Sequence, residues 1–246
     1  MTRGRLNALI EACILVVGGL VFVFGQQLGG RPASTAFANA RSLQSAERWL
    51  HIDVEPAMNE WLTGHPWLIV AAVCVYRLYY VVLLGVVVFV FVRHSEVFVH
   101  VRRVMVAMAL LVLPVYWAVP MAPPRFAVPG VVDIVAEHDL WGRPASGAVD
   151  YGQLHFTAMP SMHTGWSLWC AYAVWTALRG RHPRAALLAW VFPLIMIAVV
   201  FTTGNHFMLD VVGSCLLLLA AVGAAVGWDY LVRRVRSARV SADVRD

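Results

Sequence analysis

Residues 203–220 read TGNHFMLDVVGSCLLLLA, and this stretch decides the fold because a short polar segment runs directly into a long apolar one. With its continuation to residue 232, the apolar run is long enough for a helix to cross the roughly 30 Å hydrocarbon core of a bilayer. His206 and Asp210 lie at its start, and a spacing of four residues puts both on one helix face. Because an aspartate in an apolar span is costly unless it is paired, the stretch predicts a membrane helix with a His/Asp pair at its mouth.

A second stretch, residues 156–163, reads FTAMPSMH and leads into an apolar run at 164–178. It places His163 where a loop enters a helix. Backbone N–H groups in the first turn of a helix lack intrahelical partners and can bind an anion. The hydroxyl groups of Ser161 and Thr164 accompany those N–H groups, so the stretch predicts a phosphate-binding helix start.

Composition places the chain in the membrane class. Its 246 residues are 60% hydrophobic and only 13% charged, which is unusual for a soluble domain. All 19 basic residues are arginines, and they cluster beside apolar runs, so membrane topology explains them better than nucleic-acid binding. The four cysteines lie in apolar runs without C-x-x-C spacing, which predicts neither disulfides nor zinc. We therefore expect no metal, no cofactor and no nucleic-acid partner.

The apolar runs predict an all-α, polytopic membrane protein that forms a single domain with six transmembrane helices. The first run could instead be a signal peptide cleaved near the A-x-A sequence at 38–40, but a polytopic chain favours a retained helix. The predicted spans are residues 8–24, 66–92, 104–120, 164–178, 185–203 and 208–232.

Residues 38–63 separate the first two spans and combine charged residues with apolar residues at helical spacing. Trp49 and Trp61 resemble the aromatic anchors of membrane interfaces, so we expect an interfacial amphipathic helix, with a plain connector as the alternative. The loop at 121–155 is long enough to form a lid or a partner surface. Residues 233–246 form a short basic tail.

The distribution of arginines predicts the orientation. Thirteen arginines flank one set of loops and five flank the other, with Arg77 inside a span. Since arginine-rich loops stay in the cytoplasm, the amino terminus, the 93–103 and 179–184 loops and the tail are predicted to be cytoplasmic. The 26–65 and 121–155 loops would then lie on the extracytoplasmic face of the cell membrane. His163, His206 and Arg125 would share that face.

The histidines and Asp210 suit phosphoryl transfer. Bonding of Asp210 to one nitrogen of His206 would fix the tautomer and make the other nitrogen more nucleophilic. Such a histidine can attack phosphorus to give a phosphohistidine, which splits one displacement into two. His163 would protonate the departing alkoxide and later activate the acceptor.

Two arginines are candidates for binding phosphate. Arg125 follows the prolines that end the third predicted span, and its guanidinium can bind phosphate in a bidentate manner. Arg77 lies inside the second span among Tyr76, Tyr79 and Tyr80. Since a central arginine is costly in a membrane, Arg77 either faces the same site or extends to an interface.

The motifs PSMHT at 160–164 and GNHFMLDVVG at 204–213 resemble the second and third signature motifs of the type 2 phosphatidic acid phosphatase superfamily. They are closest to the branch that contains inositol phosphorylceramide synthase and sphingomyelin synthase. The resemblance covers roughly residues 38–225. It implies a six-helix membrane enzyme in which His206 is the nucleophile, Asp210 its partner and His163 the acid and base.

The sequence departs from that superfamily at two cations. The lysine of its first motif, K-x-x-x-x-x-x-R-P, corresponds to Ala118, and Phe126 replaces the proline. The arginine six residues before the histidine of the third motif corresponds to Val200. Arg125, with Arg77 as a second candidate, would have to compensate for both.

The predicted function is metal-independent phosphoryl transfer from a lipid phosphate or phosphodiester, either to water, as in a phosphatase, or to a polyol, as in an inositol-type phosphotransferase. A transporter or channel lined by Arg77, His163 and His206 is the alternative from another class. A metal-dependent hydrolase using His155 and the other site residues, and a serine protease using Ser161, are further alternatives. The latter lacks the G-x-S-x-G motif. The sequence leaves the oligomeric state open.

Overall fold

The computed structural model describes residues 3–28, 32–138 and 156–243, and almost all of this described chain is helical. Within it, the only extended pairing is an isolated bridge between Met121 and Thr157. The helices are α1 (Arg3–Gln27), α2 (Ala33–Leu50), α3 (Glu55–Thr63), α4 (Pro66–Arg93), α5 (Ser95–Ala118), α6 (Pro124–Ala127), α7 (Ile134–Glu137), α8 (Met162–Leu178), α9 (Pro183–Leu188), α10 (Val191–Thr202) and α11 (Met208–Asp243).

Five helical segments are long and apolar enough to cross a membrane, which confirms a multi-pass, all-α membrane protein. They are Ala8–Gln27, Pro66–Arg93, Ser95–Ala118, Pro183–Thr202 and Met208–Val235. The predicted fourth span corresponds to α8, which has 17 residues and is not among these five. Five of the six predicted spans therefore correspond to candidate membrane-crossing helices, and the count of six stays a prediction.

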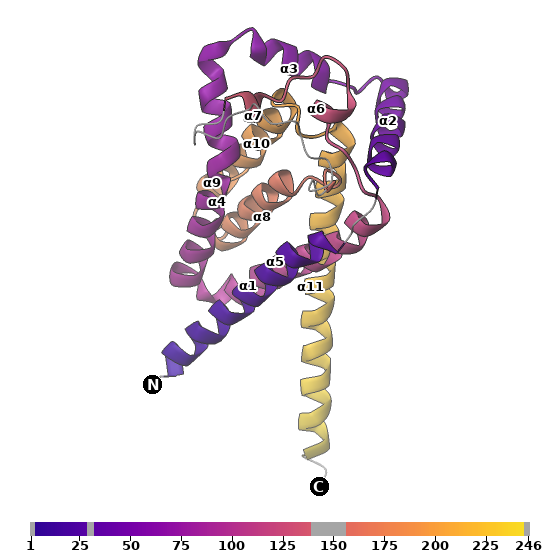
Figure 1. The fold of residues 1–246 in the computed structure, drawn as a ribbon. Coiled ribbons are helices and arrows are strands. Elements are labelled where there is room, and N and C mark those ends of the chain that lie inside the picture. The colour runs from indigo at the N-terminus through magenta and orange to yellow at the C-terminus, as the bar shows by residue number, and fades with distance from the viewer. Residues whose placement is uncertain (1–2, 29–31, 139–155, 244–246) are drawn as a thin grey trace.

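Helix α8 lies inside the bundle and packs against α4, α5, α9, α10 and α11. Trp169 at its centre is 1% exposed, and its indole N–H donates to the carbonyl of Val101 on α5 at 2.9 Å. Outer helices such as α1 and α4 instead present leucine and valine side chains outward. This arrangement places α8 in the middle of the helix bundle (Figure 1).

The predicted single helix at 38–63 is two helices, α2 and α3. His51 ends α2 in the left-handed conformation, with φ of 57°, and its N–H caps the carbonyls of Arg48 and Glu47. Pro56 stands in the first turn of α3, where its missing N–H removes no helical hydrogen bond. Together the two helices form an angled segment that contacts α6 and α11 through α2, and α4 and α10 through α3.

One predicted loop is partly helical, and one predicted span is divided. Helix α5 already begins at Ser95, within the predicted 93–103 loop, and Arg102 and Arg103 on it form ion pairs with Glu11 and Asp229. These pairs let a charged turn continue as helix beside the apolar core. The predicted fifth span is divided into α9 and α10, and Pro193, which cannot donate a backbone hydrogen bond, lies just after the division.

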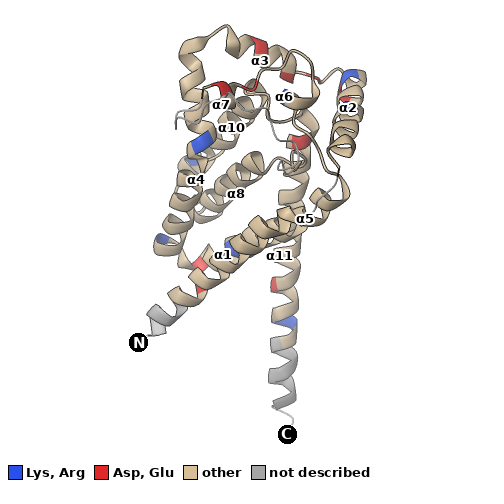
Figure 2. Ribbon diagram, in the orientation of Figure 1, with Lys and Arg blue, Asp and Glu red and all other residues tan. Residues whose placement is uncertain are grey.

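Long stretches of the spanning helices carry no charged residue (Figure 2). Helices α3, α6 and α7 lie at the end of the molecule opposite both termini (Figure 1). Loop segments from residues 119–133 and 156–161 meet at this end, where Met121 N donates to Phe156 O at 2.8 Å. Residues 139–155 of the predicted 121–155 loop lie outside the described residues.

Candidate functional site

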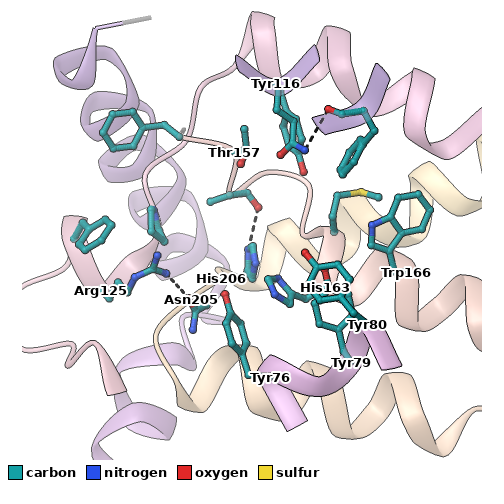
Figure 3. A pocket seen from close by; sticks show the side chains of 17 residues that line it. Tyr76, Tyr79, Tyr80, Tyr116, Arg125, Thr157, His163, Trp166, Asn205 and His206 are labelled. Atoms are coloured by element: carbon teal, nitrogen blue, oxygen red, sulfur yellow. Dashed lines mark hydrogen bonds between the residues drawn. The ribbon is translucent and has the colours of Figure 1, made fainter. Parts of the chain in front are cut away.

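A cavity of about 200 Å³ lies where the loops at this end of the bundle meet α4, α5 and α8. It contains both histidines singled out from the sequence (Figure 3). Its lining combines one arginine and two histidines with tyrosines and with other polar and apolar side chains: Phe22, Gln26, Tyr76, Tyr79, Tyr80, Tyr116, Pro123, Arg125, Phe126, Phe156, Thr157, Ala158, Met162, His163, Trp166, Asn205 and His206.

His206 is held by two acceptors on one side of its ring. Its Nδ1 lies 2.9 Å from the carbonyl oxygen of Ala158 and 3.3 Å from Asp210 Oδ2. A carbonyl oxygen can only accept, so Nδ1 carries the proton and Nε2 keeps its lone pair. Asp210 is fully buried, and its Oδ2 also accepts the N–H of Phe207 at 2.9 Å. The predicted His206–Asp210 pair is therefore present as a hydrogen-bonded pair.

The surroundings of His206 keep its imidazole neutral. Burial, with the nearby charge of Arg125 as a second cause, lowers the pKa of His206 to about 3. The hydrogen bond to Ala158 opposes this shift. A neutral ring at physiological pH is the form that can act as a nucleophile.

His163 lies next to His206, with 6.0 Å between the ring centroids (Figure 3). Its imidazole stacks on Tyr76, with a centroid distance of 4.2 Å and an interplanar angle of 21°, and contacts Tyr79 at 4.6 Å. The two aromatic rings hold the imidazole against α4. The two histidines thus approach one small space from different elements, which a nucleophile and an acid require.

Arg125 supplies the positive charge at the opposite side of the cavity. Its Nη1 donates to Asn205 Oδ1, and its Nε lies 3.1 Å from Asp133 Oδ2. Asn205 Oδ1 also accepts the hydroxyl of Tyr76 at 3.2 Å. The backbone N–H of Arg125 donates to Gly204 O at 2.9 Å, which joins the proline-rich turn to the loop before α11. The guanidinium is therefore fixed in place beside the two histidines.

Gly204 makes that close approach possible. It has φ of 69°, and a Cβ there would lie 2.6 Å from Val131 Cγ1. A side chain at this position would therefore strain the backbone and push α6 away from the loop.

Ser161 and Thr164 lie behind the cavity wall. Both are completely buried, Ser161 Oγ donates to Thr164 Oγ1 at 3.2 Å, and it accepts the Thr164 N–H at 3.3 Å. Ser161 is therefore the N-cap of α8. Its own N–H and carbonyl bond to Asp210 O and to the hydroxyl of Ser214. These bonds tie the start of α8, which carries His163, to the start of α11.

Arg77, the second predicted phosphate ligand, is not among the cavity-lining residues. Its neighbours Tyr76, Tyr79 and Tyr80 line the cavity instead. On a helix, positions 76, 79 and 80 share one face, whereas position 77 is turned by about 100°. Helical spacing was the signal that could have identified the tyrosines from the sequence. Asn205 could have been found from its place next to His206.

The family model of the PAP2 superfamily matches residues 41–224. The chain belongs to the PAP2 superfamily. Members of this superfamily are generally phosphatase-like enzymes, and the match contains both histidines, Asp210 and Arg125. No curated protein matches the chain, and no solved structure matches it either.

Two positions in the PAP2 match, Val200 and Ala118, lack the cations that the family motifs have there. Val200 is completely buried in α10, and its carbonyl accepts the N–H groups of Asn205 and His206 at 2.9 and 3.3 Å. Ala118 is the last residue of α5. No group of three or more potential metal ligands occurs in residues 3–28, 32–138 and 156–243. His155, which the metal-dependent alternative required, lies outside these ranges.

Proposed function

We propose that this PAP2 protein transfers the phosphoryl group of a lipid phosphate or phosphodiester through a phosphohistidine at His206. The observation that carries the proposal is the hydrogen bonding of His206, whose Nδ1 faces Ala158 O and Asp210 while its ring borders the cavity. A neutral imidazole fixed in this tautomer presents a lone pair, and the neighbouring His163 is placed to handle the proton.

The proposed reaction has two displacements. His206 Nε2 forms a bond to phosphorus while the bond from phosphorus to the lipid oxygen breaks, and His163 gives that oxygen a proton. The acceptor hydroxyl then loses its proton to His163 and attacks phosphorus, and the phosphorus–nitrogen bond breaks. Arg125 stabilises the charge on the phosphoryl oxygens, with Arg77 as a second candidate cation. Ser161 and Thr164 contribute by fixing the helix start that carries His163.

A second cavity supports a lipid as the substrate. It has a volume of about 370 Å³ and an almost entirely apolar lining from α1, α4, α5 and α8. Phe22, Tyr80 and Trp166 line both this cavity and the one with the histidines, so the two adjoin. A phosphate at His206 could therefore have its hydrocarbon chain in the apolar cavity, where burial of each CH₂ is favourable by about 0.8 kcal/mol.

The proposed topology has six spans, with α8 as the fourth and the histidine cavity on the extracytoplasmic face. Arginine placement supports this orientation, because the richer set of loops would be cytoplasmic. Exposed Trp49 on α2 and Trp61 on α3 support an interfacial position for this segment. Nothing in the described residues favours the transporter alternative.

Purified protein incubated with a panel of labelled lipid phosphates and phosphodiesters should release the lipid alcohol from at least one of them. Parallel incubations with inositol, with other polyols and with none identify the acceptor. Water yields inorganic phosphate from a phosphate monoester and a phosphate monoester from a phosphodiester, whereas a polyol yields a new phosphorylated polyol. Turnover should persist in the presence of a chelator. The absence of product from the entire panel would contradict the proposal.

Replacing Gly19 with leucine should lower kcat/KM for a long-chain lipid phosphate by about tenfold. Gly19 lines the apolar cavity, and a Cβ there has no atom within 4 Å, so the new side chain occupies the cavity without a backbone clash. A water-soluble phosphate ester with no long chain should be turned over at the wild-type rate. Gly85→Leu is the matched control, because Gly85 also has open space but lies outside the cavity. Equal losses of kcat/KM on both substrates would show that the hydrocarbon chain of the lipid does not bind in the apolar cavity.

Arg125→Gln should lower kcat/KM by about 10²- to 10³-fold, since one charged donor to the phosphoryl oxygens is lost. Arg48→Gln removes the same charge from an exposed side chain on α2 and should have little effect. A steady-state assay with the best substrate of the panel compares the two. Equal rates for the two variants would argue against phosphate binding by Arg125.

A further inference from the structure

The first turn of α11 has acidic groups bound to its free N–H groups. The helix begins at Met208, so Phe207 is its N-cap and Asp210 its third residue. Asp210 Oδ2 accepts the N–H of Phe207 at 2.9 Å, as the third residue does in a capping box. The N–H of Asp210 itself donates to Phe207 O at 3.2 Å. His206 directly precedes this turn, so its position depends on how the turn is held.

Two further carboxyl groups reach the same turn from distant parts of the chain. Glu55 of α3 accepts the N–H of Met208 through its Oε1, and Glu47 of α2 accepts the N–H of Leu209 at 2.7 Å. Glu47 is completely buried and Glu55 is 2% exposed. Burying a glutamate is expensive unless it is paired, so this placement calls for a specific interaction.

The two glutamates accept from neighbouring N–H groups, those of Met208 and Leu209, so two carboxyl groups meet at one buried helix start. Two carboxylates only accept hydrogen bonds and repel each other when buried together, so one of the pair must carry a proton, which it can donate to the other. Glu47 Oε2 has no hydrogen-bond partner among the described residues, which marks it as the oxygen that carries this proton toward Glu55. Glu47 is therefore the protonated donor and Glu55 the acceptor.

The surrounding charges favour this protonated state. Asp210 is the charged neighbour from α11 that acts on both glutamates. Arg125 of α6 is bound to Asp133 and Asn205 instead, and α10 carries no ionisable residue. On α4, which packs against α3, the ionisable groups nearest this end are Cys74, Tyr76 and Arg77. A helix N-terminus carries only about half a positive charge, which cannot balance three carboxylates.

We infer that Glu47 and Glu55 are positioning residues that share one proton and clamp the first turn of α11, which fixes His206 and Asp210 against the cavity. This inference rests on the proposed function for its effect on turnover. The clamp joins α2, α3 and α11, three segments far apart in the sequence, at one helix start. Its loss would loosen the nucleophile without removing any group that contacts the phosphate.

The pKa of Glu47 gives the inference a pH window. Burial raises the pKa of Glu47 from 4.5 to about 8, and the charges of Glu55 and Asp210 add to this shift. Burial likewise raises the pKa of Glu55. A carboxyl whose pKa is higher in the folded protein than in the unfolded chain binds more protons when folded. It therefore stabilises the fold at pH values below 4.5, and this stabilisation is lost as the pH rises to about 8.

The Glu47→Gln variant tests the shared proton. A glutamine amide can donate to Glu55 and accept from Leu209, but it cannot lose a proton. We expect kcat of the wild type to fall as the pH rises above about 8, and this alkaline fall to be absent in Glu47→Gln. Glu47→Ala removes the clamp and should lower kcat by about 10²-fold with little change in KM, since displacement of a catalytic group by about 1 Å has such an effect.

Glu60→Gln is the matched control, because Glu60 is an exposed glutamate on α3 and its variant should keep the wild-type pH profile. Thermal midpoints provide a readout without substrate: from pH 5 to 8 the wild type should lose stability relative to Glu47→Gln. Glu55→Gln repeats both tests if Glu47→Gln does not fold. Identical pH profiles and parallel thermal midpoints in wild type and variant would overturn the inference. A difference in thermal midpoints without turnover of any lipid phosphate would leave the clamp standing and remove the proposed function.

Discussion

His206→Ala should reduce turnover of every lipid phosphate by about 10⁶-fold, which is background in a lipid assay. The variant lacks the nitrogen that would bond to phosphorus, and the rest of the cavity cannot replace it because the other imidazole, His163, lies 6.0 Å away between centroids. With a labelled substrate, the wild type should accumulate a phosphorylated protein. The His206→Ala variant should form none under the same conditions. The measurement is rapid quenching of purified enzyme, followed by detection of label that stays on the protein.

The fold of His206→Ala should persist, since the imidazole is 7% exposed at the edge of a cavity and Asp210 keeps its bond to Phe207. His138→Ala, which changes an exposed histidine at the same end of the molecule, provides the control for expression and thermal unfolding. Retained activity in His206→Ala would mean that the phosphoryl group never bonds to this residue. A labelled protein in that variant would point to a different nucleophile.

Sequence patterns were sufficient for features that depend on long apolar runs and on short motifs. The run after His206 predicted α11, and the four-residue spacing predicted that His206 and Asp210 would bond. The predicted shared helix face was wrong, because α11 begins only at Met208 and His206 lies in the loop before it. The same reasoning could not reveal the bond to Ala158, which comes from 48 residues earlier in the chain. Contacts of this kind depend on how loops cross at the end of the bundle, which local spacing does not encode.

On α4, helical periodicity identifies the cavity-lining residues better than charge does. Arg77 is costly in a membrane and so was predicted to face the site, whereas the tyrosines at 76, 79 and 80 line the cavity. Tyr76 both stacks on His163 and donates to Asn205, so it connects His163 to the residue that holds Arg125. A phenol hydroxyl can both donate and accept hydrogen bonds, so these tyrosines suit a cavity for phosphate although their neighbours on α4 are apolar.

The division between α2 and α3 could not be predicted from amphipathic spacing, because both helices continue the same pattern of apolar residues. Residues 51–54 separate them, with His51 in the left-handed conformation, and Pro56 stands in the first turn of α3. The turn has a consequence for the site, since it lets Glu47 and Glu55 approach one helix start from two directions. In the sequence these glutamates resemble solvated charges on an interfacial helix.

Asp210→Asn should lower kcat by about 10²- to 10⁴-fold, the upper value being the loss seen when the carboxylate of a catalytic triad is made neutral. The asparagine oxygen can still accept the Phe207 N–H, and Ala158 O still accepts from Nδ1, so the cap and the tautomer are retained. What disappears is the negative charge that stabilises the imidazole as it becomes cationic on bonding to phosphorus. Single-turnover measurements should place the loss in formation of the phosphohistidine.

Stability distinguishes this role from a structural one. Asp210 is fully buried, one of its oxygens has no hydrogen-bond donor in the described residues, and two glutamates lie near it. Removing that buried charge should leave the thermal midpoint of Asp210→Asn equal to or above that of the wild type while turnover falls. The residual activity of Asp210→Asn should also begin its alkaline fall at a lower pH than the wild type. Burial, followed by the charges of Glu55 and Asp210, raises the pKa of Glu47, so loss of the Asp210 charge lowers that pKa. A near-normal rate in Asp210→Asn would mean that Ala158 alone orients His206. A lower thermal midpoint with a proportional loss of activity would mean that the role of Asp210 is structural.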